Sequence, residues 1–245
     1  MHDDSCDISV VIPVFNEEDN LEPLMDELQP VLDELGKKYE VLCVDDTSTD
    51  ASLEVLKKLQ RTRPYLRILL HRINSGESAG QATGFAYAKG KIIITMDADQ
   101  QNDPADIPAL LDALHDDVAA VCGVRRKRMD TIVKKISSRT ANAFRNFVTG
   151  DTISDAGCTY RAIRRSALWQ MQTFNGMHRF LPTILRLQGY RVVEILVNDR
   201  SRTRGYSKYG IGNRMWRGIL DCFAMRWLRK RAFRGDRVES EYFPR

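Results

Sequence analysis

The chain has 245 residues, enough for one α/β domain with a substantial core, or for one domain with an appendage. With 43% hydrophobic and 29% charged residues, its composition is that of a soluble globular protein and argues against intrinsic disorder. The net charge is only +4, yet 24 of the 33 acidic residues lie within residues 1–120, and 27 of the 37 basic residues follow them. The basic second half is either a solvated surface or the contact site of an anionic partner: a phosphorylated substrate, an anionic membrane or a nucleic acid.

Cysteine usage and hydropathy indicate the compartment. The 5 cysteines are scattered and form no CxxC pair, which argues against a disulfide framework or a zinc site and favours a reducing cytosol. The acidic start, Met1–Asp4, lacks the apolar region of a signal peptide. No apolar stretch approaches the ~18–20 residues of a transmembrane helix. We therefore expect a cytoplasmic protein that is neither secreted nor membrane-spanning.

Apolar, β-branched runs alternate with amphipathic helical patterns in the first half of the chain. Strands are expected at Ile8–Phe15, Tyr39–Val44, Leu66–Leu70, Lys91–Met96 and Ala119–Val124. Helices are expected at Asp19–Leu35, Ser52–Leu59, Ala79–Ala88 and Ala105–Leu114. This alternation predicts an α/β fold with a doubly wound, mostly parallel sheet flanked by helices.

The second half is less regular. Its expected elements are a helix at Thr131–Val148, an irregular strand region at Asp155–Ile163, a helix at His178–Leu187, a strand at Arg191–Val197 and a last helix at Asn213–Arg231. Without a repeat or a long linker, we expect one domain over residues 1–212. Residues 213–245, a basic amphipathic helix and tail, belong to the same domain or dock on a membrane or a partner.

Acidic side chains follow three of the predicted strands: Glu17 follows the first, Asp45 and Asp46 end the second, and Asp97 and Asp99 follow the fourth. The carboxyl ends of parallel strands meet at one edge of a sheet, where ligands bind. Crowded carboxylates repel one another, and a bound divalent cation relieves that repulsion; oxygen ligands suit Mg²⁺ or Mn²⁺. Alternate residues at a strand end point the same way, so Asp97 and Asp99 can address one metal.

A purely structural role would also fit these features. The segment after the fourth strand could be a solvated loop or the cap of the helix that starts at Asp103-Pro104. Three glycines have two possible roles, which are close approach of the backbone to a ligand and tight packing: Gly76, Gly80 and Gly84. The chain lacks G-x-G-x-x-G after the first strand and lacks G-x-x-x-x-G-K-[ST] throughout, which disfavours a Rossmann dehydrogenase and a P-loop NTPase.

Together these motifs resemble the family 2 glycosyltransferases of GT-A fold. Val11–Glu18 resembles the opening motif of that family, Val44–Asp50 its V-D-D-x-S-x-D and Asp97–Gln101 its D-A-D-x-Q. The resemblance implies a nucleoside-diphosphate sugar donor, with UDP or GDP as the nucleotide, and Mg²⁺ or Mn²⁺ held by Asp97, Asp99 and Gln101. It places the donor against Pro13, Phe15, Glu17, Asp45, Asp46, Gly76, Asp97, Ala98 and Asp99.

The second half resembles the polyprenol-phosphate branch of that family, typified by dolichol-phosphate mannosyltransferase. Ser138–Asn142 resembles S-R-x-x-N, Asp155–Arg161 resembles D-x-x-x-G-[FY]-R, and Arg202–Lys208 resembles R-x-x-G-x-S-K. Thr159 stands where the branch usually has Gly, and Tyr206 replaces a common Glu. The resemblance implies inverting transfer of a hexose to a polyprenyl phosphate. It also implies that a loop with Arg202 and Lys208 closes over the donor phosphates.

The basic side chains suggest how an acceptor phosphate binds. Arg125 and Arg139, with Ser138, could hold a phosphate monoester, which is largely ionised at neutral pH and needs no strong base. The metal held by Asp99, together with Arg202 and Lys208, would stabilise the leaving diphosphate. A hydroxyl acceptor would need a base, for which Asp155 is the candidate. The favoured alternative for Asp155 is a structural ion pair with Arg161 or Arg139.

Two further interpretations concern the second half. His178 is expected to be a packed or hydrogen-bonded core histidine. The last helix has apolar residues at helical spacing among arginines, so it is either a membrane-surface anchor or a helix packed on the core or on a partner. Its apolar residues are Met215, Trp216, Ile219, Leu220, Phe223, Trp227 and Leu228. We expect the protein to associate peripherally with the membrane or to dock on a membrane partner.

Three rival functions are weighed against transfer to a lipid phosphate. One is a family 2 transferase acting on a saccharide hydroxyl, which the branch motifs disfavour. Another is a non-catalytic nucleotide-sugar-binding protein, which intact metal ligands disfavour. A nucleic-acid-binding protein would explain the basic half, but it leaves the acidic strand ends unexplained and its usual motifs are missing.

Overall fold

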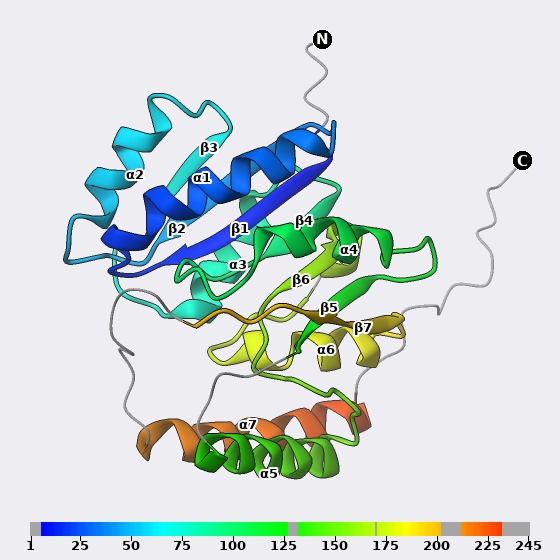
Figure 1. Ribbon diagram of the computed structural model, residues 1–245. Helices are drawn as coiled ribbons and strands as arrows, with labels where there is room; N and C mark the ends of the chain where they lie inside the picture. Colours follow the sequence, from blue (N-terminus) through cyan, green and yellow to red (C-terminus); the bar gives the residue numbers. More distant parts are fainter. Residues whose placement is uncertain (1–5, 127–131, 170, 202–211, 232–245) are drawn as a thin grey trace, which may run out of the picture.

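The computed structural model describes residues 6–126, 132–169, 171–201 and 212–231, with the backbone alone described for 132–139 and 212–217. A 7-stranded sheet runs through the molecule in the order β3-β2-β1-β4-β6-β5-β7 (Figure 1). Neighbouring strands pair in parallel except β6, which is antiparallel to β4 and β5. The strands are β1 Ile8–Val14, β2 Tyr39–Asp45, β3 Leu66–Leu70, β4 Ile92–Thr95, β5 Ala120–Arg125, β6 Arg161–Arg164 and β7 Val192–Val197.

Helices cover both faces of the sheet, which confirms the predicted doubly wound α/β fold. They are α1 Glu18–Glu34, α2 Ser52–Gln60, α3 Glu77–Tyr87, α4 Ile107–Asp112, α5 Ile132–Thr149, α6 Leu181–Leu187 and α7 Gly212–Arg231. Short 3₁₀ helices are η1 Pro104–Asp106, η2 Arg165–Leu168 and η3 Met177–Arg179. The two longest helices of the second half, α5 and α7, begin and end within one residue of their predicted limits.

The structure corrects two expected elements of the second half. The irregular strand predicted at Asp155–Ile163 pairs only over β6, because a turn in which the Cys158 amide donates to the Asp155 carbonyl precedes it. The helix predicted at His178–Leu187 is divided into η3 and α6. Pro182 explains the division, since proline has no N–H and its fixed φ suits the first turn of a helix.

The core explains why β1 is apolar almost throughout. Ile8, Val10 and Ile12 belong to the main cluster, which also holds the apolar faces of α1, α2 and α4. Val11 faces the opposite side, where it packs with Ile93 and Phe85. A strand that is buried on both faces reads as a continuous hydrophobic run, which is the pattern of a central parallel strand.

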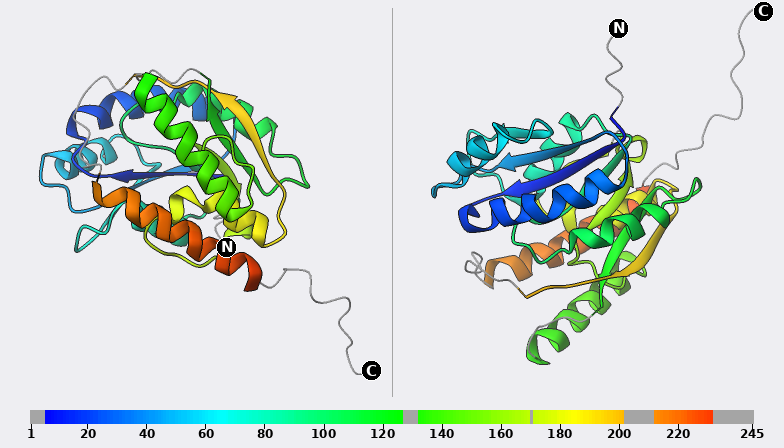
Figure 2. Two further views of the ribbon diagram at one scale, coloured as in Figure 1. Left: turned by 90° about the horizontal axis from the view of Figure 1, so that it is seen from below. Right: turned by 45° about the horizontal axis from the view of Figure 1, so that its top comes forward.

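Helices α5 and α7 lie side by side and form a layer below the sheet in the view of Figure 1; Figure 2 shows the same pair from two other directions. Val148 of α5 and Cys222 and Met225 of α7 are buried in one cluster with Met177, Phe180 and Ile184. The pair is therefore anchored to the domain through η3 and α6. Among the described helices, none combines the length and apolar character that crossing a membrane requires.

Two glycines let α3 approach β1 closely. A Cβ atom on Gly80 would lie 2.9 Å from Cβ of Pro13, and one on Gly84 would overlap the side chain of Val11. Of the two roles considered for these glycines, tight packing is the one that their surroundings support. The close approach sets the distance of α3, and hence of its N-terminus, from the end of β1.

We expect Gly84→Ala to destabilise the fold by about 1–3 kcal/mol through overpacking against Val11. At an open helical position the same change would raise stability by up to about 1 kcal/mol, because alanine is the better helix former. Urea denaturation followed by circular dichroism decides the sign. Ala86→Gly, on the exposed side of α3, is the control for helix propensity alone. A higher urea midpoint for Gly84→Ala would show that the helix is not tightly packed here.

Candidate functional site

The carboxyl ends of β1, β2 and β4 lie next to one another, because β1 pairs in parallel with both of the others. Just beyond each end stands a non-glycine residue in the left-handed region: Asn16 with φ 56°, Thr47 with φ 61° and Gln100 with φ 61°. Such backbone costs of order 1–3 kcal/mol per residue and persists where the surroundings enforce it. Three of these residues at one sheet edge mark that edge as the candidate site.

Hydrogen bonds tie the first two loops together. The Asn16 amide donates to Oγ of Ser48 at 2.9 Å, and its side-chain oxygen accepts from the Thr49 amide at 2.7 Å. Glu17 stands at the start of α1 and accepts from Asn20 at 2.6 Å. The predicted donor residues Pro13 and Phe15, both half-buried, lie on this same segment. These contacts hold the loops after β1 and β2 as one unit.

Asp46 holds the segment that leads into α3. Its carboxylate accepts from the Ser75 amide at 2.8 Å and from the Gly76 amide at 2.6 Å, and it lies 2.7 Å from Nδ1 of His71. Gly76 has φ 85°, which favours glycine. Asp45 is buried and accepts from the Ser48 amide at 3.3 Å. The Asp46 carboxylate therefore orders the predicted donor residue Gly76, and its direct contact with a donor stays a prediction.

The segment after β4 concentrates negative charge. Asp97 is partly buried, and loss of solvation, followed by the nearby carboxylates of Glu77 and Asp99, raises its pKa to about 7. Ala98 is buried, and Asp99 is buried and accepts from the Gln101 amide at 3.2 Å. The Gln101 side chain donates to the Arg200 carbonyl at 3.4 Å. Residues 97–101 thus hold two carboxylates close together, and among the described residues the carboxylates near Asp97 outweigh Arg161 in their effect on its pKa.

A divalent cation fits this donor set. Within the described part of the chain, no group of three His, Cys, Asp or Glu side chains is placed to hold a metal. The protein would therefore supply one or two carboxylates, and Mg²⁺ characteristically completes such a shell with waters and substrate phosphates. Two adjacent carboxylates, one of which has a raised pKa, suit a metal ion that arrives together with a phosphate ligand.

Thr159 contacts Asp97 directly. Its hydroxyl donates to Oδ2 of Asp97 at 2.7 Å, and its own carbonyl accepts from the hydroxyl of Thr95 in β4. The Asp97 amide in turn donates to the side-chain oxygen of Asn102 at 2.8 Å. The residue that departs from the motif therefore adds a hydrogen bond to a predicted metal ligand, and it does not disrupt the backbone.

Glu77 is a residue of this site that the motifs missed. It begins α3 directly after Gly76, and its Oε2 lies 3.6 Å from Nε2 of His178. The other ring nitrogen of His178 lies 2.6 Å from the Ser78 hydroxyl, and the imidazole is buried. This confirms the expectation of a hydrogen-bonded core histidine. The one available signal for Glu77 was its place beside a glycine at a helix start, because it belongs to no recognisable motif.

Arg125 and Asp155 form a bidentate ion pair. Nε and Nη2 of Arg125 donate to the two carboxylate oxygens at 2.7 and 2.9 Å. The bonds to Asp155 raise the pKa of Arg125 further above its ordinary value, although burial opposes them. Of the two partners expected for Asp155, Arg161 forms other contacts, and the side chain of Arg139 is not among those described, so that pairing stays a prediction. Arg161 is buried and donates instead to the carbonyls of His178 and Cys158.

Four of the predicted site residues lie outside the described structure or side chains. Arg202 and Lys208 fall within residues 202–211, and Ser138 and Arg139 belong to the part of α5 whose side chains are not described. The residues predicted to contact the donor thus lie mainly near the ends of β1, β2 and β4. Of the acceptor-side prediction, Arg125 and Asp155 are placed, and they contact each other.

A comparison with known proteins finds a family match that covers the strand ends described above. The family model described as Glycosyl transferase family 2 matches residues 9–172. Undecaprenyl-phosphate 4-deoxy-4-formamido-L-arabinose transferase of Edwardsiella ictaluri is 38% identical over 207 residues, which cover 83% of this chain and 63% of that protein. Dodecaprenyl-phosphate galacturonate synthase of Rhizobium johnstonii is 35% identical over 226 residues, covering 90% and 67%. The chain spans about two thirds of the length of these relatives.

Solved structures share the fold. Glucosyl-3-phosphoglycerate synthase from Mycobacterium tuberculosis, in complex with Mn²⁺, UDP-glucose and phosphoglyceric acid, superposes with a TM-score of 0.67 at 19% identity, over 90% of this chain and 79% of that one. A mannosyltransferase from Pyrobaculum calidifontis, in complex with GDP-mannose and Mn²⁺, does so with a TM-score of 0.61 at 20% identity, over 92% and 64%. This likeness confirms the GT-A fold expected from the sequence. From its fold, the match over residues 9–172 and relatives at this identity, the chain belongs to glycosyl transferase family 2.

Proposed function

We propose that this protein transfers a sugar from a nucleoside-diphosphate sugar to a polyprenyl phosphate with inversion at the anomeric carbon. The observation that carries the proposal is the pair Asp97 and Asp99 at the end of β4, beside the ordered loops that follow β1 and β2. The relatives at 35–38% identity are named for transfer to undecaprenyl or dodecaprenyl phosphate, which supports the lipid acceptor.

On the donor side, Asp97, Asp99 and Gln101 would hold Mg²⁺ or Mn²⁺. A cation held there would supply positive charge opposite the departing diphosphate. The protein orients the donor through the loops that Asn16 and Asp46 hold in place. Arg202 and Lys208, which lie outside the described residues, would donate charge-assisted hydrogen bonds to the phosphate oxygens. The solved neighbours with UDP-glucose or GDP-mannose and Mn²⁺ share this fold and motivate the assignment.

On the acceptor side, the nucleophile is an ionised phosphate oxygen, which attacks the anomeric carbon from the face opposite the leaving group. A phosphate monoester is largely dianionic at pH 7, so no base has to remove a proton. Both carboxylate oxygens of Asp155 already accept from Arg125, which disfavours Asp155 as a general base for a hydroxyl acceptor. Arg125, with Arg139 and Ser138 on α5, remains the proposed phosphate contact.

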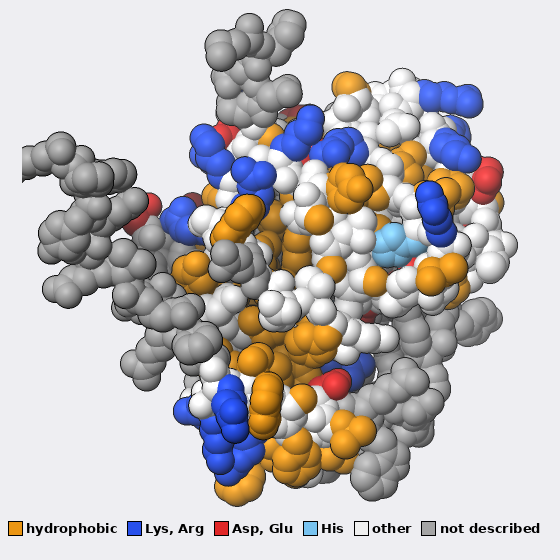
Figure 3. All heavy atoms as spheres, turned by 180° about the vertical axis from the view of Figure 1, so that it is seen from behind, with side chains coloured by type: hydrophobic (Ala, Val, Ile, Leu, Met, Phe, Trp, Pro, Cys, Tyr) orange, Lys and Arg blue, Asp and Glu red, His pale blue; other side chains and the backbone are white. Residues whose placement is uncertain are grey.

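The layer of α5 and α7 is the proposed membrane-facing surface. It exposes several large apolar side chains: Phe147 is 82% exposed, Leu220 66% and Trp227 61%. In Figure 3 hydrophobic side chains gather along the lower part of the molecule, where α5 and α7 lie, with a group of basic side chains beside them. Exposed aromatics next to arginines are characteristic of peripheral binding at an anionic membrane surface, where a polyprenyl phosphate would be met.

Asp99→Asn should lower sugar transfer by about a hundredfold or more, because it removes a charge that holds the cation at the departing diphosphate. The assay supplies labelled UDP- and GDP-sugars, Mn²⁺ or Mg²⁺ and a short polyprenyl phosphate, and counts organic-extractable label. Asp112→Asn, at an exposed position of α4, is the matched control. Label that enters an oligosaccharide and never the lipid would instead establish the saccharide-hydroxyl transferase.

Thr159→Val should weaken Mn²⁺ binding by about 10–100-fold, the usual effect of removing a hydrogen bond that orients a metal ligand. Valine keeps the shape of threonine but cannot donate to Asp97. Thr159→Ser retains the hydroxyl and should bind Mn²⁺ nearly as the native protein does. Electron paramagnetic resonance titration of free Mn²⁺ measures both dissociation constants. Equal affinity of the valine variant and the native protein would remove the positioning role of Thr159.

Trp227→Ala should weaken binding to anionic vesicles by about 10- to 100-fold, because burial of a large apolar side chain contributes roughly 1.5–3 kcal/mol. Trp169→Ala is the matched control, since Trp169 is 78% exposed but lies at the end of η2, outside α5 and α7. Cosedimentation with vesicles of phosphatidylglycerol gives both partition constants. If the two variants bind equally, α5 and α7 do not form the membrane-facing surface.

A further inference from the structure

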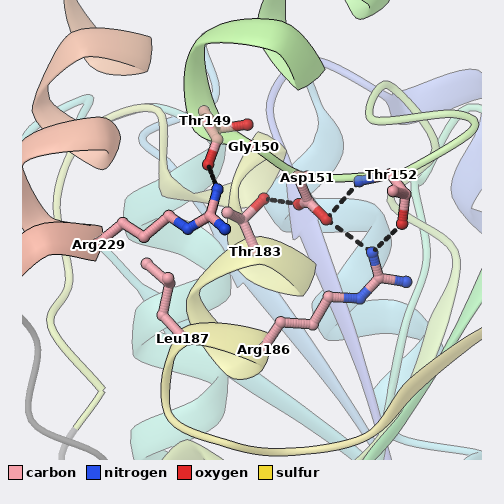
Figure 4. Close-up of a pocket in the computed structure, with 8 residues that line it drawn as sticks. All are labelled: Thr149, Gly150, Asp151, Thr152, Thr183, Arg186, Leu187 and Arg229. Atoms are coloured by element: carbon pink, nitrogen blue, oxygen red, sulfur yellow. Dashed lines mark hydrogen bonds and ion pairs between the residues drawn. The ribbon is translucent and has the colours of Figure 1, made fainter.

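A pocket of about 300 Å³ lies where the end of α5, helix α6 and helix α7 meet, and none of its lining residues belongs to the proposed transfer site (Figure 4). Arg186 of α6 and Arg229 of α7 reach toward it from different walls, with Leu187 between them. Thr149–Thr152 form the third wall. The pocket is therefore built from three segments that are far apart in the sequence and is lined mainly by polar groups.

The charge of this pocket is positive and only partly balanced. Asp151 is the one acidic side chain among its described lining residues, and that side chain is only 3% exposed. Its oxygens accept from Arg186 at 2.6 Å, from Thr183 at 2.5 Å and from the Thr152 amide at 2.8 Å. Arg145 lies 3.5 Å from the same carboxylate. With Arg229 the neighbourhood holds three guanidinium groups against one shielded carboxylate, so an anion that enters meets net positive charge.

Gly150 allows Arg229 to occupy this place. The glycine has φ 65°, and a Cβ atom there would fall on the guanidinium of Arg229. Nη1 of Arg229 donates to the Thr149 carbonyl at 2.9 Å at the end of α5, and within the described part of the chain it forms no ion pair. Its position is therefore set by backbone, while its charge remains available to a ligand. The lack of a side chain at Gly150 is therefore required for Arg229 to line the pocket in this position.

We propose that this pocket binds a phosphate ester. Guanidinium groups recognise phosphate through paired, charge-assisted hydrogen bonds, and the volume accommodates a phosphate with part of its substituent. Arg229 and Trp227 both belong to α7, so a lipid headgroup at the proposed membrane-facing surface is one source of that phosphate and a soluble phosphate ester is the other. The pocket would be a second anion site in addition to the transfer site, and this proposal rests on the proposed function only for the lipid source.

The test measures binding in the absence of donor and acceptor, so its failure is distinct from failure of sugar transfer. Glycerol 1-phosphate is titrated by NMR, and vesicles with and without phosphatidylglycerol are titrated by cosedimentation. Arg229→Gln should weaken glycerol phosphate binding about tenfold, the cost of losing a charged hydrogen bond. Lys230→Gln removes the same charge from the adjacent exposed position of α7 and should change it less than about twofold.

A second pair of variants tests the geometry. Gly150→Ala should reproduce the loss seen in Arg229→Gln by displacing the guanidinium. Gly189→Ala introduces comparable strain, because Gly189 has φ 91°, but has nothing within 4 Å to displace and should bind normally. Thermal unfolding confirms that each variant is folded.

The two assays distinguish the sources of the phosphate. If Arg229→Gln weakens vesicle binding more than Lys230→Gln does, the phosphate is a lipid headgroup. If Arg229→Gln weakens only the binding of glycerol phosphate, the phosphate belongs to a soluble ester. The proposal would be overturned if glycerol phosphate did not bind, or if Arg229→Gln and Lys230→Gln weakened its binding equally.

Discussion

Repulsion among the carboxylates at the end of β4 is the constraint on which the candidate site depends. Asp97 lies near both Glu77 and Asp99, and its pKa is raised to about 7 in the protein without a bound cation. A raised pKa of a carboxyl group means that the folded protein disfavours its ionised form, so the cluster costs stability at neutral pH. A cation that binds there offsets this cost, and the site is therefore built to bind positive charge.

The rest of the architecture keeps that cluster in one geometry. Thr159 and Asn102 hold Asp97 from two sides, and Asp46 orders the turn at Gly76 that places Glu77. Gly80 and Gly84 let α3 approach β1 closely, which fixes the distance of Glu77 from the strand end. The left-handed residues beyond the ends of β1, β2 and β4 are themselves strained, and the surrounding loops hold them in place. A fixed set of loops is what differential binding of a reacting donor requires.

Periodicity and strand-end chemistry predicted the mostly parallel sheet, the chain order of most of its elements and the position of the carboxylates at the strand ends. Such features are local: an alternating run or an acidic residue after a strand is visible within a few positions. The ion pair of Arg125 with Asp155 and the contact of Glu77 with His178 join residues 30 and about 100 positions apart, and they depend on how segments pack. Likewise, a short helix such as α6 begins where Pro182 permits, which the apolar pattern alone does not reveal.

The central claim is that the carboxylates of Asp97 and Asp99 bind a divalent cation together with the diphosphate of the donor. Calorimetric titration of Mn²⁺ into the protein, with and without UDP or GDP, tests it most directly. Linkage requires each ligand to raise the affinity of the other by the same factor, and we predict coupling of at least about tenfold with one of the two nucleotides. Nucleotide binding that is unchanged when the metal is removed by a chelator would contradict this claim.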